Sequence, residues 1–596
     1  MKKHISRILV LILVLAMVAS FALPAFAEEP THTVTINGQK EDHIYEAYQI
    51  FSGKISTTGG ILSNIVCGES IDGDAFLAFL TDPARLTDKI FSEVIIVDGV
   101  EKEILNVFAG KTSAEDVAKV LQGYGDKDSM LDTFAKYAAN FLKKDGAGKP
   151  IPAGVSTASG TTYTISGLKS GYYLFMDKAG TVDETDDFYT KFMLEVTDGT
   201  AVTVKGSVPT IDKKVSDSAE GTYNEELVSN IGDTVYFELS ASLPSNFDIF
   251  DNYYFTFVDT MSEGLTFNKI EKIYIQRTGE QVDIADAFIN GGTGAAGVSV
   301  TPVVDSLGQP TGENTFTVKI GDLKDKAFPD LLLTNKIVIR YSATVNDKAV
   351  IGVPGNPNEV TLKYSNNPYD SGEGSTGPDD AIVFTFGVNV NKFDKAETTK
   401  LLNDAKFVLY RRNLYTDGGV SKLQVSFATV ANGKVTGWHT IDGILPGANA
   451  MITWNSIVAD TTKMPAEVLA KITLTTQEIG GTEGRISVAG LDEGVYHLLE
   501  IEAPDGYNLP HEPFVITIVP TKDTTTGKIN GMEYEFGSAT KDDANKDGFA
   551  EIDIGNGKGN TLPSTGGIGT TIFYVLGSVM ALGAAVILVS KRRMAA

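Results

Sequence analysis

Cysteine is almost missing from this chain, which has one, Cys67, among 596 residues. One cysteine leaves no internal disulfide to form, so any covalent stiffening must use other side chains. The six histidines show no HxxxH or HExxH spacing and there is no CxxC pair, so neither zinc nor haem binding is predicted. Nucleophile-elbow, P-loop and dinucleotide-binding signatures are also missing from strand–helix contexts. The sequence therefore predicts no enzyme, no metal and no cofactor.

Basic clusters are scarce between the two ends of the chain. The formal net charge is −26, and no acidic residue lies before Glu28 or after Thr565, whereas each of those end segments carries three Lys or Arg residues. The segment between them is therefore more acidic than the chain as a whole. Phosphate binding needs grouped Lys and Arg, so this composition excludes a nucleic-acid partner.

The C-terminal end carries the most specific signal. Leu562-Pro563-Ser564-Thr565-Gly566 precedes an apolar run at 568–590 and three basic residues at 591–593. Roughly 20 apolar residues cross a bilayer, and a basic tail stays in the cytoplasm. The pentapeptide resembles the sortase substrate motif of Gram-positive bacteria, in which the sortase cysteine attacks the Thr–Gly bond; here that carbonyl belongs to Thr565. We expect a cell-wall sorting signal over 561–596 and a transient membrane-held precursor.

The N-terminal end predicts export. Three basic residues within the first seven precede an apolar run at 8–23, and Ala25-Phe26-Ala27 has the small-x-small pattern of a signal-peptidase site. Residues 1–27 are thus an expected signal peptide, with cleavage after Ala27. Both ends together indicate a secreted protein anchored in the cell wall of a Gram-positive bacterium.

The segment between the two signals is long enough for about three domains. Residues 28–205 mix strand-like alternation with helical periodicity, which predicts an α+β domain. From Pro209 onward, alternating apolar residues and short turns predict strands only, with a Gly- and acid-rich interruption at 370–380. We expect a mainly β protein of tandem immunoglobulin-like β-sandwich domains, the second over 206–386 and the third over 387–560.

Helices are expected in the middle of the first domain. Thr112-x-x-Glu115 fits a capping box that opens a helix over 114–122. A second helix is indicated by residues at helical spacing, Met130, Phe134, Tyr137 and Phe141. Such a stripe favours packing of the helix on a sheet over a binding role.

One lysine, one acid and one amide fall on apolar strand faces of the second domain. Residues two apart on a strand share a face, so Lys213 should point inward and Lys214 outward. By the same count Asp259 lies in phase with the phenylalanines that precede it, and Asn358 with the apolar residues that follow it.

The third domain repeats this trio. Lys392, Glu500 and Asn556 each lie in phase with the apolar residues before them. A buried lysine can lose its proton and become a nucleophile, while a buried acid can keep its proton and polarise the asparagine carbonyl. Each trio could thus form an amide bond between the lysine and asparagine side chains, with loss of ammonia. An ordinary buried ion pair is the alternative that parity alone leaves open.

Longer motifs add a family resemblance. Residues 496–507, YHLLEIEAPDGY, match YxLxExxAPxGY, the E-box of CnaB-like domains in sortase-assembled pilins. Residues 209–215 (PTIDKKV) and 358–366 (NEVTLKYSN) are similar to the first and last strands of the middle domain of backbone (shaft) pilins. Residues 48–51 and 171–174 resemble their N-terminal domain.

The resemblance implies CnaA/CnaB-type domains stiffened by Lys–Asn isopeptide bonds. It assigns Lys213–Asn358 with Asp259 and Lys392–Asn556 with Glu500 as the cross-links and their acids. Asp233 also lies on an inward face and is a rival to Asp259. In the first domain the E-box acid position holds Met176, and Asp177 comes one residue late, so no isopeptide bond is expected there.

The family also implies an acceptor lysine. It usually follows a proline near the end of the first domain, shortly before a Pro-Thr pair. Lys205 keeps the spacing to Pro209-Thr210 but follows Val204. An exposed structural lysine is the alternative for Lys205, and Lys214 or Lys213 would be the next candidates.

The resemblance implies a major structural subunit of a covalent pilus. Its expected partners are the polymerising and housekeeping sortases, identical subunits, minor or tip pilins, and peptidoglycan. The alternative is a wall-anchored adhesin or minor pilin that binds a host surface ligand and needs no internal acceptor lysine.

Overall fold

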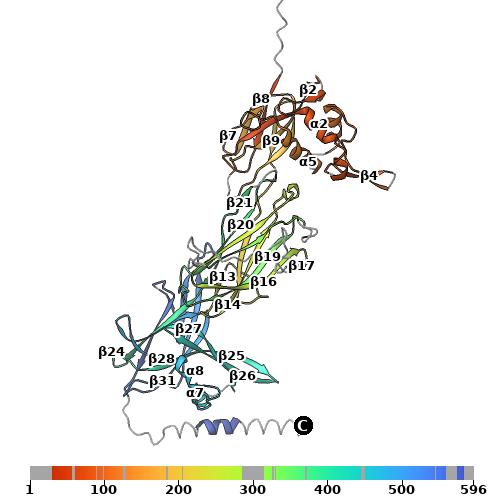
Figure 1. The fold of residues 1–596 in the computed structure, drawn as a ribbon. Coiled ribbons are helices and arrows are strands. Elements are labelled where there is room, and N and C mark those ends of the chain that lie inside the picture. Colours follow the sequence, from red (N-terminus) through yellow and green to blue (C-terminus); the bar gives the residue numbers. More distant parts are fainter. Residues whose placement is uncertain are drawn as a thin grey trace, which may run out of the picture.

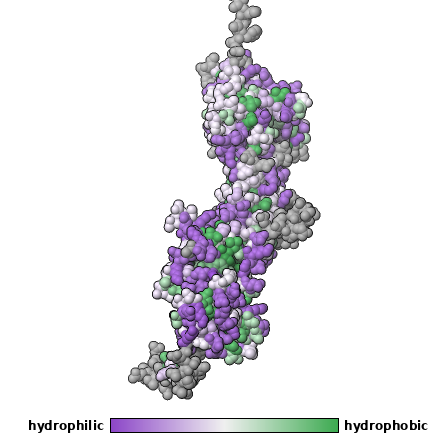
Figure 2. Space-filling view, turned by 90° about the vertical axis from the view of Figure 1, so that its left-hand side faces the viewer, coloured by the Kyte–Doolittle hydropathy of each residue, from purple (hydrophilic) through white to green (hydrophobic). Residues whose placement is uncertain are grey.

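Three lobes follow one another along an elongated molecule in the computed structural model, in the order of the sequence (Figure 1). Figure 2 shows the same row of lobes from the side, with a mostly hydrophilic surface. The structure describes residues 30–56, 61–88, 90–97, 100–124, 129–182, 185–204, 206–284, 314–324, 328, 331–368, 372–444, 450–543, 545–558 and 574–582.

Several expected features lie outside this described part. They are the signal peptide with Ala27, the acceptor candidate Lys205 and the pentapeptide at 562–566. Of the expected membrane span at 568–590, only 574–582 is described, and no helix among the described residues is long and apolar enough to cross a bilayer.

The N-terminal lobe combines two sheets with a helical layer. One sheet has the order β11 (Thr200–Thr203), β1 (Thr31–Asn37), β8 (Thr162–Lys169), β7 (Thr157–Ser159). The other has the order β10 (Lys191–Val196), β9 (Gly171–Asp177), β2 (Tyr45–Ile55), β3 (Leu62–Cys67), with β6 (Gly154–Val155) also paired to β2. The helical elements are α2 (Gly73–Thr81), α3 (Arg85–Asp88), α4 (Ala114–Leu121), α5 (Ser129–Ala138) and η1 (Ala139–Phe141), and β4 (Glu93–Val97) and β5 (Val100–Ile104) form a separate hairpin.

The predicted helices form, with one correction. Ser113, not Thr112, caps α4: its hydroxyl accepts from the Asp116 amide at 3.1 Å and donates to the Asp116 carboxylate at 2.8 Å. The predicted capping box was therefore wrong by one residue, because Ser113 and Asp116 offer the same spacing. The stripe on α5 packs in the aromatic core against the sheet, with Phe134 fully buried.

The middle lobe is a sandwich of two sheets around one apolar core. One sheet has the order β12 (Ile211–Ser216), β14 (Thr234–Ser242), β19 (Lys336–Val345), β16 (Leu265–Arg277), β17 (Glu280–Asp283). The other has the order β13 (Glu226–Val228), β22 (Asp379–Phe384), β20 (Asn356–Ser365), β15 (Phe255–Met261), β18 (Asn314–Ile320), with β21 (Glu373–Ser375) also paired to β20.

The stretch at 370–380 does not interrupt the strands as predicted. β21 lies inside it and β22 begins in it, and both pair with β20. Its glycines disfavour a strand locally, but backbone pairing with an established neighbour outweighs that preference.

The C-terminal lobe is one strongly curved sheet of 13 strands. Its main path is β24 (Glu397–Leu401), β23 (Phe386–Asp394), β30 (Thr482–Leu491), β27 (Lys434–Ile444), β26 (Val420–Ala431), β25 (Lys406–Asp417), β31 (Gly494–Glu502), β32 (Phe514–Lys522), β33 (Ile529–Phe536), β34 (Ala539–Asp542). The first and last strands of the lobe, β23 and β35 (Phe549–Asn556), are parallel neighbours. The short strands β28 (Thr473–Thr475) and β29 (Gln477–Ile479) pair with β25 and β30.

Two helices in this lobe were not predicted. They are α7 (Ala450–Ala459) and α8 (Ala466–Ile472), and they cover a second small core that contains Trp454. The expectation of strands only from Pro209 onward was therefore wrong. The segment Ala466–Ile472 is rich in good helix formers, which is the signal that could have revealed α8.

Candidate cross-linking sites

The middle lobe brings together Lys213, Asp259 and Asn358 from three strands, β12, β15 and β20. All three side chains have no exposed surface. Lys213 Nζ donates to Asp259 Oδ2 and, at 2.7 Å, to Asn358 Oδ1. Because β12 lies in one sheet and the other two strands in the facing sheet, the trio spans the sandwich.

Burial changes the protonation chemistry of this site. It lowers the pKa of Lys213 to about 8, against the attraction of Asp259, and it raises the pKa of Asp259. Asp259 Oδ1 has no hydrogen-bond partner among the residues that the structure describes. A neutral carboxyl group tolerates that bare oxygen better than a carboxylate would. Both shifts move the pair toward a neutral amine beside a neutral acid.

The C-terminal lobe builds an equivalent trio from β23, β31 and β35. Lys392 Nζ donates to Glu500 Oε2 at 2.5 Å and to Asn556 Oδ1 at 2.6 Å, and Asn556 Nδ2 donates to Glu500 Oε1 at 2.5 Å. Burial lowers the pKa of Lys392 to about 8 and raises that of Glu500. The curvature of the sheet places β31 against β23, although four strands separate them along its path.

Each trio has the geometry that amide formation needs. The amine touches the amide group it would attack, and a buried acid lies against the amine, ready to carry a proton. An ion pair alone needs only two of the three residues, whereas here the asparagine contacts the lysine in both sites. Reacting groups held this close and well oriented can have effective molarities of roughly 10⁵–10⁸ M.

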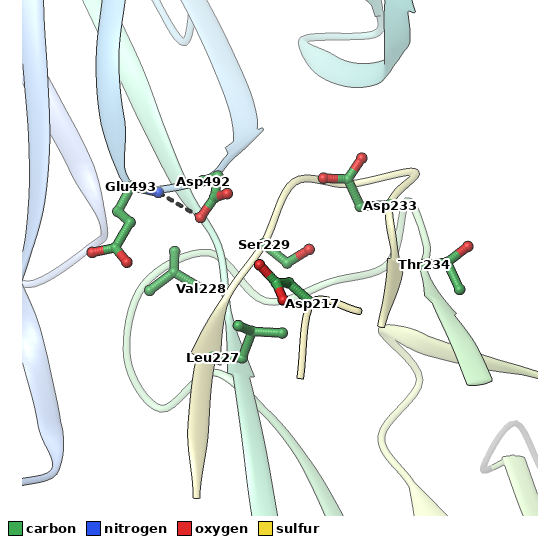
Figure 3. Close-up of a pocket in the computed structure, with 8 residues that line it drawn as sticks. All are labelled: Asp217, Leu227, Val228, Ser229, Asp233, Thr234, Asp492 and Glu493. Atoms are coloured by element: carbon green, nitrogen blue, oxygen red, sulfur yellow. Dashed lines mark hydrogen bonds between the residues drawn. The ribbon is translucent and has the colours of Figure 1, made fainter. Parts of the chain in front are cut away.

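Asp233, the rival acid, lies elsewhere. Its carboxylate accepts from Asn230 Nδ2 at 2.7 Å, and it lines a pocket between the middle and C-terminal lobes (Figure 3). The pocket has a volume of about 350 Å³, and Asp217, Asp492 and Glu493 add three further carboxyl groups to its wall. Burial, with the charges of Glu493 and Asp233, raises the pKa of Asp492 to about 7.

The N-terminal lobe contains a buried ionic triad that the sequence analysis missed. His43 Nδ1 lies 2.7 Å from Asp177 Oδ1, and His43 Nε2 lies 3.0 Å from Asp187 Oδ2. Burial disfavours the charge on His43, but hydrogen bonds to both aspartates outweigh it and raise the pKa of His43 to about 10. Asp177, which lies one residue after the position of the E-box acid, therefore contacts the imidazolium of His43.

Two family models match separate parts of the chain. Residues 386–533 match the SpaA family model, described as a prealbumin-like fold domain, and residues 556–595 match the LPXTG cell wall anchor motif. The chain is 28% identical over 423 residues to the trypsin-resistant surface T6 protein of Streptococcus pyogenes serotype M6, covering 67% of this chain and 71% of that protein.

Solved structures of pilins resemble the chain at low sequence identity. The T6 backbone pilin of serotype M6 Streptococcus pyogenes is 17% identical, with a TM-score of 0.48, covering 90% of this chain and all of that one. The full-length major pilin SpaD of Corynebacterium diphtheriae is 14% identical, with a TM-score of 0.41, covering 89% of this chain and 98% of that one.

The anchor motif defines a surface protein attached to the cell wall. The SpaA-domain match, the anchor motif and the likeness to the T6 protein together support a sortase-assembled pilin of a Gram-positive bacterium. The predictions of a mainly β fold with tandem immunoglobulin-like domains and of a pilus backbone subunit are confirmed by the SpaA-domain match, the anchor motif, the likeness to the T6 protein and the sheets described above.

Proposed function

We propose that the chain polymerises into a pilus shaft through Thr565 and Lys205. The sortase thiolate attacks the Thr565 carbonyl and expels the glycine amine; the Lys205 amine of the next subunit then attacks the thioester and releases the thiol. The new bond is an amide between the Thr565 carbonyl and Lys205 Nζ. The housekeeping sortase would end growth by transfer of a final subunit to peptidoglycan.

The two buried trios are the observation that carries the shaft assignment. In each, the neutral lysine amine attacks the asparagine Cγ, the buried acid supplies a proton to the departing nitrogen, and the lysine nitrogen returns one proton to the acid. Ammonia leaves and an amide remains. Asp259 and Glu500 act once per molecule, so this is self-processing and not enzymatic turnover.

The positions of the bonds suit a subunit that bears tension. Lys392 lies on the first strand of its lobe and Asn556 on the last, and these strands are parallel neighbours. Force that enters β23 and leaves through β35 would pass through the covalent link and spare the strands between them. Lys213 likewise lies on the first strand of the middle sandwich, and Asn358 lies in the facing sheet.

Immunoblots of wall extracts test polymerisation. A shaft subunit gives a ladder of species that resists heat and detergent, and Thr565→Ala abolishes both ladder and wall attachment. Lys205→Ala should retain a wall-attached monomer but lose the ladder, with Lys214→Ala as the matched control. A single wall-attached band in the unaltered strain would favour the adhesin alternative instead.

A further inference from the structure

The two trios differ in how the acid reaches the asparagine. Glu500 uses one oxygen for Lys392 and the other, directly, for Asn556 Nδ2. Asp259 has a side chain one methylene shorter, and the hydroxyl of Tyr341 stands between it and the amide. Asn358 Nδ2 donates to the Tyr341 hydroxyl at 2.7 Å, and that hydroxyl donates to Asp259 Oδ2 at 2.8 Å.

Tyr341 is held firmly in this position. It lies on β19 with no exposed surface, and its ring stacks on Phe237 with 5.3 Å between centroids. Phe316 packs edge-on against the same ring at 4.8 Å. Burial raises the pKa of Tyr341 well above its usual value, so the hydroxyl keeps its proton and remains a donor.

Among the described residues, no hydroxyl hydrogen-bonds the side chain of Glu500 or Asn556. The aromatic ring beside Lys392 Nζ belongs to Phe407, at 5.2 Å from the ring centroid, whereas Tyr341 lies 5.7 Å from Lys213 Nζ. A glutamate that reaches the amide directly needs no intermediary. In the middle site the hydrogen bonds from the amide to the acid run through Tyr341.

We propose that Tyr341 is a catalytic residue of the middle-lobe cross-link and carries the proton from Asp259 to the leaving nitrogen of Asn358. This inference rests on the proposed isopeptide chemistry. When Lys213 Nζ bonds to Asn358 Cγ, the amide nitrogen becomes an amine that can accept a proton. The Tyr341 hydroxyl, which donates to Asp259 Oδ2 before the attack, then turns toward that nitrogen, gives it its proton and takes the carboxyl proton of Asp259. Ammonia leaves, and the proton lost by Lys213 Nζ restores Asp259.

Mass spectrometry of the mature ectodomain after timed synthesis tests this role. The unaltered protein should lose one ammonia at each trio. Tyr341→Phe should slow the middle cross-link by roughly 10²-fold or more, the lower range for a proton-transfer group. The C-terminal cross-link should form at its normal rate in the same molecule. Tyr364→Phe, which removes another buried hydroxyl of the same lobe, should leave both cross-links unaffected.

A double variant separates the chemical role from a structural one. Asp259→Glu with Tyr341→Phe lets the longer acid reach the amide, so the middle cross-link should return. A Tyr341→Phe protein that cross-links at the normal rate would overturn the proposal, as would a folded double variant that forms no middle cross-link. An unaltered ectodomain with neither ammonia lost would instead refute the isopeptide chemistry itself.

Discussion

The N-terminal lobe and the two lobes after it hold their buried acids in different ways. Asp177 and Asp187 bind the imidazolium of His43, which is a reversible ionic contact. Asp259 and Glu500 each lie against a lysine that also touches an asparagine. Only the second arrangement offers a nucleophile together with an amide that can release ammonia.

The buried ionic triad differs from a trio able to cross-link itself in two residues, a histidine in place of the lysine and an aspartate in place of the asparagine. Hydrogen bonds to two aspartates raise the pKa of His43 against the effect of burial, whereas burial lowers the pKa of Lys213 and Lys392. The ionic triad also adjoins the junction with the middle lobe, because the Asp187 carbonyl accepts from Tyr364 at 3.1 Å. Four predictions test the comparison.

Loss of one cross-link should have the largest effect. The Glu500→Ala protein should lose one ammonia fewer than the unaltered protein. The melting temperature of its C-terminal lobe should fall sharply. The bond closes a loop between residues 164 positions apart, and a loop of that size contributes roughly 5 kcal/mol by the chain-entropy estimate used for disulfides. Intact mass and calorimetry measure both changes. Glu502→Ala, which removes an exposed partner of Lys406, is the matched control.

Loss of the ionic triad should have the next largest effect, confined to the N-terminal lobe. His43→Gln leaves two buried carboxylates without their cation, which costs about 3–5 kcal/mol for a buried pair. Hydrogen exchange should show faster opening of this lobe, with both cross-links still present by mass. His32→Gln, in the same lobe, should change little. An N-terminal lobe as stable as before would mean that the triad is structurally neutral.

Alkaline pH should weaken the same lobe selectively. The pKa of His43 is raised from 6.5 to about 10 in the folded state, so its stabilisation is complete below about 6.5 and is lost as the pH rises through about 10. The slope is at most about 1.4 kcal/mol per pH unit. His43→Gln should abolish this slope, whereas amide cross-links do not titrate. Melting curves at stepped pH provide the measurement.

The smallest effect is expected at the junction pocket of Figure 3. Burial raises the pKa of Asp492 from 3.8 to about 7, so its ionisation opposes folding increasingly as the pH rises from about 4 to about 7. Asp492→Asn should therefore stabilise the protein by on the order of 2 kcal/mol at pH 8 and by little at pH 4. The amide can still accept from the Glu493 backbone, which the carboxylate does at 2.7 Å. Asp505→Asn, at an exposed position of the same lobe, is the control, and equal stabilisation at both pH values would contradict this explanation.

Strand parity located the trio residues, because side-chain alternation is strict within a strand. Parity could not choose between Asp259 and Asp233 as the acid, since it predicts an inward side chain for both. Only the pairing of β15 with β20 places Asp259 beside Asn358. Parity also could not reveal Tyr341, which reaches the site from β19 in the sheet that faces β15 and β20.

The errors have physical causes as well. Helices α7 and α8 lie within a strand-rich region, where short helical segments give a weak periodic signal. The His43 triad joins residues 134 and 144 positions apart, and no local pattern marks such a contact. The acceptor lysine and the cleavage site at Thr565 stay predictions from sequence.

The sequence by itself determined the class of this protein. The evidence for that class is local: the pentapeptide with its apolar run and basic tail, the E-box, and the alternation of strand residues. Such patterns involve neighbouring residues and can be recognised without the fold. Tertiary structure decided which acid meets which lysine, that Tyr341 bridges Asp259 and Asn358, and that His43 lies between two aspartates. Those contacts join residues 17 to 145 positions apart in sequence. Burial at the two trios lowers the pKa of each lysine and raises the pKa of each acid.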